Sequence, residues 1–275
     1  MVMREVDVLS TLQLRRFDIS SVQSDGIVVV VGRRETGKTV LVKDLLHQKR
    51  DIPVGTVVAP TESYDKHFGS IVPPMFIHNQ YMPSVPEQAV ERQREIARQT
   101  GACGTDPRSF LILDNCLWES EWVRDGNIVT LANDPNVFFV ITMPYPLGLT
   151  PVLRQRVDYV FILREIHVPT RKRLYDLYAG MFPTFDVFCQ VLDQCTQNFE
   201  CLVIDLKSKS TRIEDQVFYY KAEPHESFRV CAPEWWAHTD NLCPVAEAPT
   251  TTTIAPDAAG SGVPFSARDY YSPKG

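Results

Sequence analysis

Short runs of apolar residues alternate along this chain with longer segments whose apolar residues recur at helical spacing. The runs that predict strands lie at 27–31, 55–60, 110–114, 137–142 and 159–163. A strand covered on both faces needs apolar side chains at nearly every position, and such strands are typical of parallel sheets. The alternation with helical segments therefore predicts an α/β fold, a doubly wound and mainly parallel sheet flanked by helices.

Two further runs, 201–206 and 216–220, are separated by a polar turn and predict a hairpin at the edge of the sheet. Residues 170–196 have aromatic and aliphatic residues at helical spacing, which favours a place in the core. Residues 1–24 alternate apolar and polar side chains. They fit either an edge strand or an arm that packs on a neighbouring subunit.

The first buried strand runs directly into a glycine-rich turn. This turn is a complete phosphate-binding loop (P-loop), and its residues are the predicted nucleotide-binding set: Gly32, Arg33, Arg34, Glu35, Thr36, Gly37, Lys38 and Thr39. The glycines let backbone N–H groups surround the β- and γ-phosphates, and the following helix adds the positive end of its dipole. Lys38 neutralises phosphate charge, and the Thr39 hydroxyl is placed to bind Mg²⁺.

The second chemical signal is Asp114, which ends the apolar run that starts at Phe110. An aspartate at the carboxyl end of a buried strand, some 75 residues after a P-loop, is typical of the Walker B acid that holds the Mg²⁺ shell. The sequence therefore predicts a nucleotide phosphate site with Mg²⁺, with Thr39 and Asp114 at the metal and Lys38 and Asp114 in catalysis.

Composition narrows the choice of partners. The net charge of −6 and the pI of about 5.6 give no global basic field, so a nucleic-acid partner would need a local basic lining. The seven cysteines form no C-x-x-C pair, which indicates neither a disulfide framework nor a zinc site. No apolar run has the length of a membrane span and the N-terminus lacks a signal-peptide core, so we expect a reducing, cytoplasm-like compartment and no membrane.

These signals divide the chain into three parts: an N-terminal arm (1–24), a P-loop ATPase domain (25–238) and a disordered tail rich in Ala, Pro and Thr (239–275). Within the domain, a polar helix near 86–99 carries Arg94 and Arg98 one turn apart. They form either a solvated face or a contact with phosphates or a subunit.

The order of several blocks resembles the poxvirus-type genome-packaging ATPases of nucleo-cytoplasmic large DNA viruses. The resemblance covers roughly residues 25–236 and rests on the P-loop and on the blocks at 58–63, 111–116, 141–148, 151–154, 157–161 and 217–222. That family is related to the FtsK and HerA motors. The resemblance implies a RecA-like ATPase that binds ATP and Mg²⁺ as cofactors, assembles into a homo-oligomeric ring and moves double-stranded viral DNA into a capsid. It also implies a place in the virion or the host cytoplasm, with capsid proteins as possible partners.

Three positions depart from the family pattern. Asn115 stands where the family has a second acid, and Pro144 where it has a glutamine that orients water or senses the γ-phosphate. Residues 131–136 lack the expected Arg-His pair. An amide cannot take a proton from water, so the substitution at Asn115 would remove general-base assistance that is worth about 10²- to 10⁴-fold in rate. Glu119 and Glu62 are substitutes on paper, although glutamates in such positions are more often plain surface acids.

Arg154 matches the family's Leu-Arg block and is the candidate arginine finger for a neighbour's γ-phosphate; the alternative is a surface arginine paired with Asp158. Two functions stay open: a DNA-translocating packaging ATPase, and a nucleotide-binding paralogue with weakened catalysis and a structural or regulatory role. A small-molecule kinase ranks third, because the sequence has no acceptor-binding signature.

Overall fold

The computed structural model of the 275-residue chain describes residues 12, 14–116, 120–146 and 149–242. The predicted tail lies outside this part except for residues 239–242, which end the last helix. Glu119 also lies outside it. None of the helices in the described part is long and apolar enough to cross a membrane.

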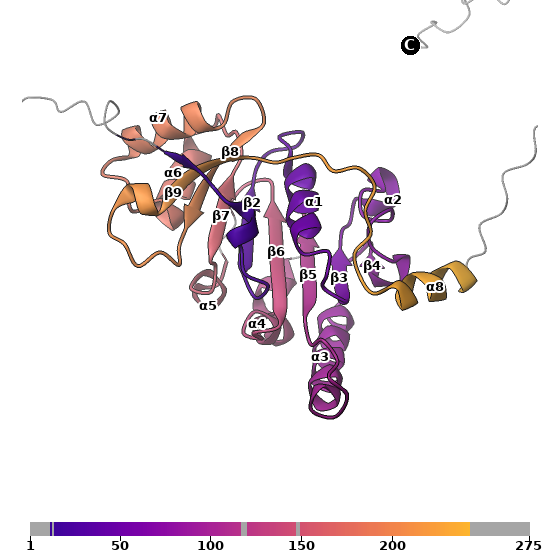
Figure 1. Ribbon diagram of the computed structural model, residues 1–275. Coiled ribbons are helices and arrows are strands. Elements are labelled where there is room, and N and C mark those ends of the chain that lie inside the picture. The colour runs from indigo at the N-terminus through magenta and orange to yellow at the C-terminus, as the bar shows by residue number, and fades with distance from the viewer. Residues whose placement is uncertain (1–11, 13, 117–119, 147–148, 243–275) are drawn as a thin grey trace, which may run out of the picture. The chain divides into compact units, whose positions relative to one another are not determined.

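A nine-stranded sheet forms the centre of the described part (Figure 1). The strands are β1 (Arg15–Arg16), β2 (Ile27–Val31), β3 (Val54–Val58), β4 (Ile77–His78), β5 (Ser109–Asp114), β6 (Val137–Met143), β7 (Tyr159–Ile162), β8 (Glu200–Asp205) and β9 (Val217–Lys221). Their order is β1-β9-β8-β7-β2-β6-β5-β3-β4, and only β8 runs against its described neighbours. The prediction of a mainly parallel α/β sheet is confirmed.

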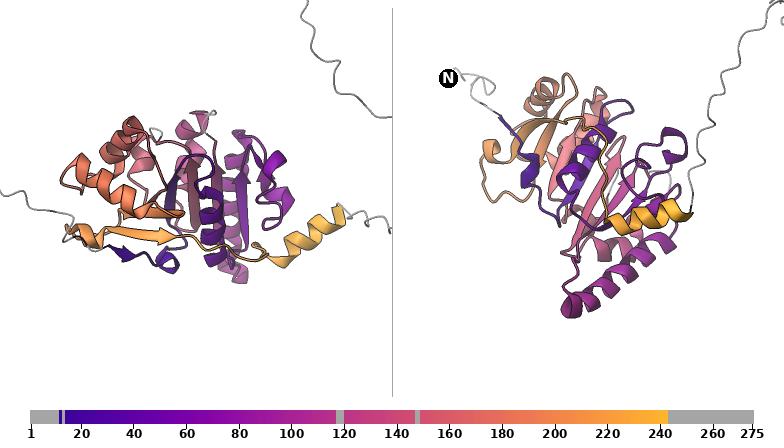
Figure 2. Two further views of the ribbon diagram at one scale, coloured as in Figure 1. Left: turned by 90° about the horizontal axis from the view of Figure 1, so that it is seen from above. Right: turned by 45° about the vertical axis from the view of Figure 1, so that its right-hand side comes forward.

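Helices cover both faces of this sheet (Figures 1 and 2). They are α1 (Lys38–Gln48), α2 (Glu62–Asp65), α3 (Ser84–Cys103), α4 (Gly126–Leu131), α5 (Pro151–Arg154), α6 (Val168–Tyr178), α7 (Phe185–Cys195) and α8 (Pro233–Leu242). Short 3₁₀ turns lie at Ile19–Ser21, Pro74–Phe76, Ser120–Arg124 and Ile213–Asp215.

Alternate residues of each strand enter two separate cores, as the period of a strand requires. Val28 and Val30 of β2 pack in the core that contains the apolar face of α1. Val29 and Val31 pack in the other, with residues of α3, α4, α6 and α7. All four valine side chains are buried, which explains why the run carries no polar residue.

The predicted hairpin is present as β8 and β9, but it is not the outermost part of the sheet. The two-residue strand β1 pairs with β9 in parallel, Arg15 opposite Phe218. Phe17, which follows β1, is buried against the rings of Phe161 and Phe218. For the described part of the N-terminal segment, the structure shows the edge strand; residues 1–11 and 13 lie outside the described residues.

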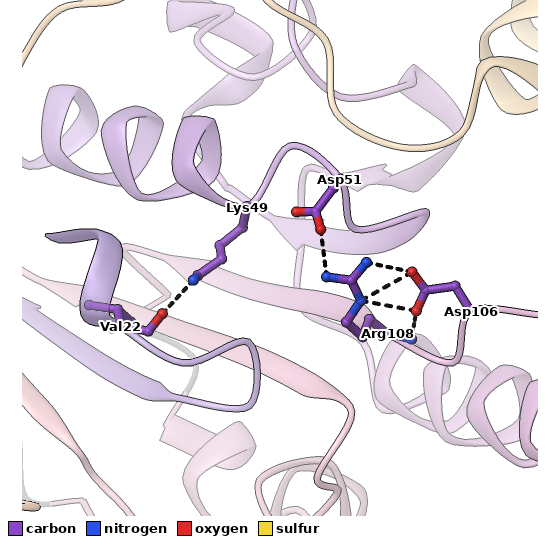
Figure 3. A network of polar contacts seen from close by, with 5 residues as sticks. All are labelled: Val22, Lys49, Asp51, Asp106 and Arg108. Carbon is purple, nitrogen blue, oxygen red and sulfur yellow. Dashed lines mark hydrogen bonds and ion pairs between the residues drawn. The ribbon is translucent and has the colours of Figure 1, made fainter.

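Polar contacts fix the end of α1 that lies far from the P-loop (Figure 3). The buried Lys49 caps α1 and donates to the carbonyl of Val22, just before β2. Arg108, just before β5, donates to Asp106 and to Asp51, both at 2.6 Å. We call Arg108, Asp51 and Asp106 the Arg108 cluster. It joins the turn after α1 to the start of β5.

The segment between β9 and α8, residues 222–232, crosses over α1 and is called the strap (Figure 1). Asp44 of α1 is 1% exposed and accepts hydrogen bonds from the Tyr220 hydroxyl (2.6 Å) and the Glu223 amide (2.9 Å). The Nε2 atom of His225 lies 2.7 Å from its other oxygen. One buried carboxylate therefore holds the strap on the helix that follows the P-loop.

Candidate functional site

The turn after β2 has the backbone geometry of a phosphate-binding loop. Gly32 extends the sheet by donating its amide to the Met143 carbonyl (3.0 Å), and α1 begins at Lys38. A Cβ on Gly32 would lie 2.7 Å from the Cβ of Leu163, and Gly37 has a φ of 103°. Both positions therefore need glycine, one for space and one for its backbone angle.

The ammonium of Lys38 lies inside this turn. It donates to the carbonyls of Gly32 (2.6 Å) and Arg33 (2.8 Å), where it lies beside the backbone amides that would surround a phosphate. Burial lowers the pKa of Lys38, and the negative charge of Asp114 opposes that shift. An anionic phosphate at the turn would supply the counter-charge that this partly buried ammonium lacks.

Asp114 is the last residue of β5. This strand pairs with β6, which in turn pairs with the P-loop strand β2. The Asp114 side chain is buried, and its Oδ1 accepts a hydrogen bond of 2.5 Å from the hydroxyl of Thr142, its register partner on β6. Burial raises the pKa of Asp114, while the Thr142 hydrogen bond and the charge of Lys38 lower it. A buried carboxyl with a raised pKa at a strand end is a functional-site signature.

A cavity of about 1280 Å³ opens at the carboxyl ends of β2, β3, β5 and β6. Most of the predicted site residues line it: Arg34, Glu35, Gly37, Lys38, Thr39 and Asp114. The remaining P-loop residues have other roles. Thr36 donates to the Arg33 carbonyl (2.8 Å) within the loop, and Arg33 lines a neighbouring hollow of about 480 Å³ with His167 and Arg173.

The donor atoms in the cavity fit Mg²⁺. Thr39 offers a hydroxyl oxygen and Asp114 a carboxylate oxygen, and both are hard ligands of the kind that Mg²⁺ takes together with phosphate oxygens and water. The raised pKa of Asp114 also fits, because a cation next to a buried carboxylate stabilises its ionised form.

The two substitutions noted in the sequence both face this cavity. Both line it: Asn115 follows Asp114, and Pro144 follows Met143, whose carbonyl accepts from the Gly32 amide. Asn115 has a φ of 56°, a left-handed backbone that asparagine tolerates better than most residues. The side chains at these positions therefore offer an amide and a pyrrolidine ring to a bound nucleotide, and no proton acceptor of useful basicity.

Glu62 cannot replace the missing acid without breaking a turn. Its carboxylate is buried and accepts three hydrogen bonds, from the Phe68 amide to both oxygens (2.8 and 3.0 Å) and from the Gly69 amide (2.7 Å). Glu62 thus holds the loop after α2. The other candidate, Glu119, lies outside the described residues and stays a prediction.

Arg154 lies away from the phosphate turn of its own chain. It ends α5, which precedes β7 and lies at the amino ends of the parallel strands (Figure 1). It forms no ion pair with Asp158, which accepts from the Ile27 amide (2.8 Å) and lies 3.7 Å from Lys207. The alternative of an Arg154–Asp158 pair is therefore wrong. Action on a neighbouring subunit stays a prediction.

Three residues at or beside the cavity escaped the sequence interpretation. Thr142 fixes Asp114, and a polar residue at the end of an aliphatic strand was the available signal. His67 and Phe199 also line the cavity, from the loop after α2 and from the turn before β8. No sequence pattern marks either residue, because the order of the strands in the sheet is what brings the two segments to the cavity.

Curated relatives of this chain come from viruses with large DNA genomes. The uncharacterized protein L437 of Acanthamoeba polyphaga mimivirus is 33% identical over 219 residues, which cover 76% of this chain and 77% of that protein. The uncharacterized protein 088R of invertebrate iridescent virus 3 is 32% identical over 212 residues and covers 76% and 79%. The chain belongs to the family of these viral proteins. Their names assign no activity, and no family model matches the chain.

Among solved structures, the genome packaging NTPase B204 from Sulfolobus turreted icosahedral virus 2, in complex with sulfate, has a TM-score of 0.50 to this chain. It is 12% identical, and the likeness covers 74% of this chain and all of that one. At this identity the likeness shows a shared fold. Together with the sheet order and the P-loop, it confirms the P-loop NTPase architecture expected from the sequence.

Proposed function

We propose that this protein is an ATP-driven motor that moves double-stranded viral DNA during genome packaging. One observation carries the proposal: Lys38, Thr39 and Asp114 line one cavity at the carboxyl edge of a parallel sheet, where α/β proteins bind their ligands. This arrangement suits a nucleoside triphosphate with Mg²⁺. The viral relatives and the fold shared with a packaging NTPase support the choice of viral DNA as the cargo.

The position of Arg154 supports a ring of identical subunits. Because it lies at the opposite edge of the sheet from its own P-loop, its guanidinium would act only on the nucleotide of a neighbouring subunit. An arginine supplied in this way stabilises charge on the transferred phosphoryl group. We place this ring in the virion or the host cytoplasm, with capsid proteins as further partners.

The deciding experiment is an ATPase assay on the full chain with Mg²⁺, with and without double-stranded DNA. We expect turnover that DNA stimulates and that rising salt weakens, because contacts with DNA phosphates release counterions. Lys38→Ala should reduce turnover by roughly 100-fold or more. Lys43→Ala is the matched control on the same helix, since Lys43 does not line the cavity. Wild-type protein without turnover under these conditions would remove the motor proposal.

The cavity also favours a second candidate, a nucleotide-binding paralogue with weakened catalysis. Asn115 and Pro144 face the cavity without a proton acceptor, and Glu62 is committed to backbone amides. This candidate predicts that a non-hydrolysable ATP analogue binds while ATP stays intact over a long incubation. The double substitution Asn115→Asp with Pro144→Gln should then raise turnover by about 10²- to 10⁴-fold. No gain would count against this explanation.

A further inference from the structure

Beyond its phosphate end, the cavity has an apolar end. Asp114, Thr39 and Lys38 line the polar part. A set of apolar residues from α1, the end of β7, the start of β8 and the strap also lines the cavity, with Lys221 beside them: Val40, Leu41, Leu163, Phe199, Cys201, Ala222 and Pro224. A triphosphate alone would leave this apolar end uncovered, whereas a nucleoside carries a flat aromatic base that suits it.

Phe199 stands out in this lining because its ring is exposed. The residue is 68% exposed, while Leu41 and Leu163 of the same lining are buried. Its ring also adjoins the phosphate turn: a Cβ on Gly37 would lie 3.7 Å from Cδ1 of Phe199. The exposed ring thus lies within reach of a side-chain position on a P-loop glycine, where a nucleotide with its phosphates in that loop would bring its base.

The backbone of Phe199 is held in an unfavourable conformation. Asn198 and Phe199 have φ angles of 52° and 63° in succession, just before β8 begins at Glu200. A bulky residue at positive φ is a genuine outlier that costs on the order of 1–3 kcal/mol. This ring gains little from burial in return, so packing does not explain the cost. Such strain is concentrated at binding sites.

We propose that Phe199 is the platform on which the nucleobase of ATP stacks, and thus a determinant of affinity for nucleotides over other polyphosphates. The proposal rests on the nucleotide site proposed above and extends it by one subsite. Tyr145, which is 45% exposed, also lines the cavity, and it borders the neighbouring hollow with Arg33 and Arg173 as well. Tyr64 is the third exposed aromatic ring in the lining and is 86% exposed. It lies with Thr61, Asp65 and His67, a polar surrounding that suits a base less well.

The test compares two ligands by calorimetry, ATP and inorganic tripolyphosphate, each with Mg²⁺ and the full chain. Phe199→Ala should weaken ATP binding by about 5- to 150-fold, the usual effect of removing an aromatic stacking partner. Tripolyphosphate binding should stay within about twofold of wild type, because it has no base. Phe199→Trp should keep ATP affinity. Leu206→Ala, an exposed apolar truncation at the other end of β8, is the matched control and should change neither ligand.

Phe199→Trp gives a second readout. With the signal of the four native tryptophans subtracted, ATP should change the emission of the new indole and tripolyphosphate should not. Equal loss of both ligands in Phe199→Ala, unchanged ATP binding, or a selective loss in Tyr64→Ala instead would each overturn the stacking proposal. If wild type binds neither ligand, the proposed nucleotide function itself fails, so the two failures are distinguishable.

Discussion

Two groups of charged side chains, one at each end of the parallel strands, differ in how their charge is stabilised. At the amino edge, the Arg108 cluster pairs a guanidinium with two carboxylates; these contacts raise the pKa of Arg108 and lower that of Asp106. At the carboxyl edge, burial lowers the pKa of Lys38 and raises that of Asp114. The charges of the Arg108 cluster are thus stabilised by their partners, whereas burial disfavours the charged forms of Lys38 and Asp114.

Backbone conformation follows the same division. Glu35, Lys66, Asn115, Asn198 and Phe199 have positive φ angles, and all lie in turns at the carboxyl edge. The remaining non-glycine example in the described residues, Cys231, lies in the strap. Strain and unpaired charge therefore gather where the cavity opens, which is the pattern expected when a site is prepared for a charged ligand at the expense of stability.

The largest expected effect comes from Asp114→Asn. The asparagine oxygen keeps the Thr142 hydrogen bond but carries no charge, so Mg²⁺-ATP binding should fall by about 100-fold or more. Without nucleotide, the variant should have a higher melting temperature than wild type at neutral pH, because it removes a carboxylate whose burial is unfavourable. Calorimetric titration and thermal unfolding measure the two effects.

The gain in melting temperature expected from Asp114→Asn should grow as the pH rises. The folded pKa of Asp114 is raised, so its ionisation costs stability as pH rises above the unfolded value of about 3.9 and through the folded value. The melting temperatures of Asp114→Asn and wild type should therefore converge as pH falls toward 4 and separate toward pH 7. A difference in melting temperature that stays constant at all pH values would show that burial of the ionised Asp114 does not cost stability.

Arg108→Ala should act in the opposite sense, on stability alone. Removing the guanidinium leaves Asp51 and Asp106 unpaired, and we expect a loss of about 1 kcal/mol in the free energy of unfolding by urea. Because the folded pKa of Asp106 is lowered, this contribution is present at neutral pH and is lost as pH falls through that lowered value. ATP affinity should not change. Arg98→Ala, which breaks an exposed pair with Glu95, is the control and should have little effect.

The smallest expected effect is a gain from Lys66→Gly. Lys66 caps α2 with φ 48° and ψ 41°, a left-handed position that glycine occupies without strain. We expect unfolding to cost about 0.5 kcal/mol more, measured by urea titration. Lys66→Ala keeps the strain and should bring no such gain. Equal gains from both variants would show that the lysine side chain, rather than the backbone, is unfavourable.

The sequence predicted those features that depend on residues close together in the chain. The P-loop is contiguous with its strand and helix, and Asp114 ends a buried run, so both were placed correctly in one cavity. Thr142 and Phe199 were missed for physical reasons. Thr142 meets Asp114 only through the β5–β6 register, and Phe199 reaches the carboxyl edge because β8 runs against its neighbours and so begins there. Neither register nor strand direction is written in local periodicity.

The single carboxylate of Asp44 makes one mechanical unit of two segments that are far apart in the chain. Asp44 lies mid-way along α1 and accepts hydrogen bonds from Tyr220 and from Glu223 of the strap. Residues of the strap also line the cavity. A movement of α1 would therefore either break these hydrogen bonds or move the strap together with the helix.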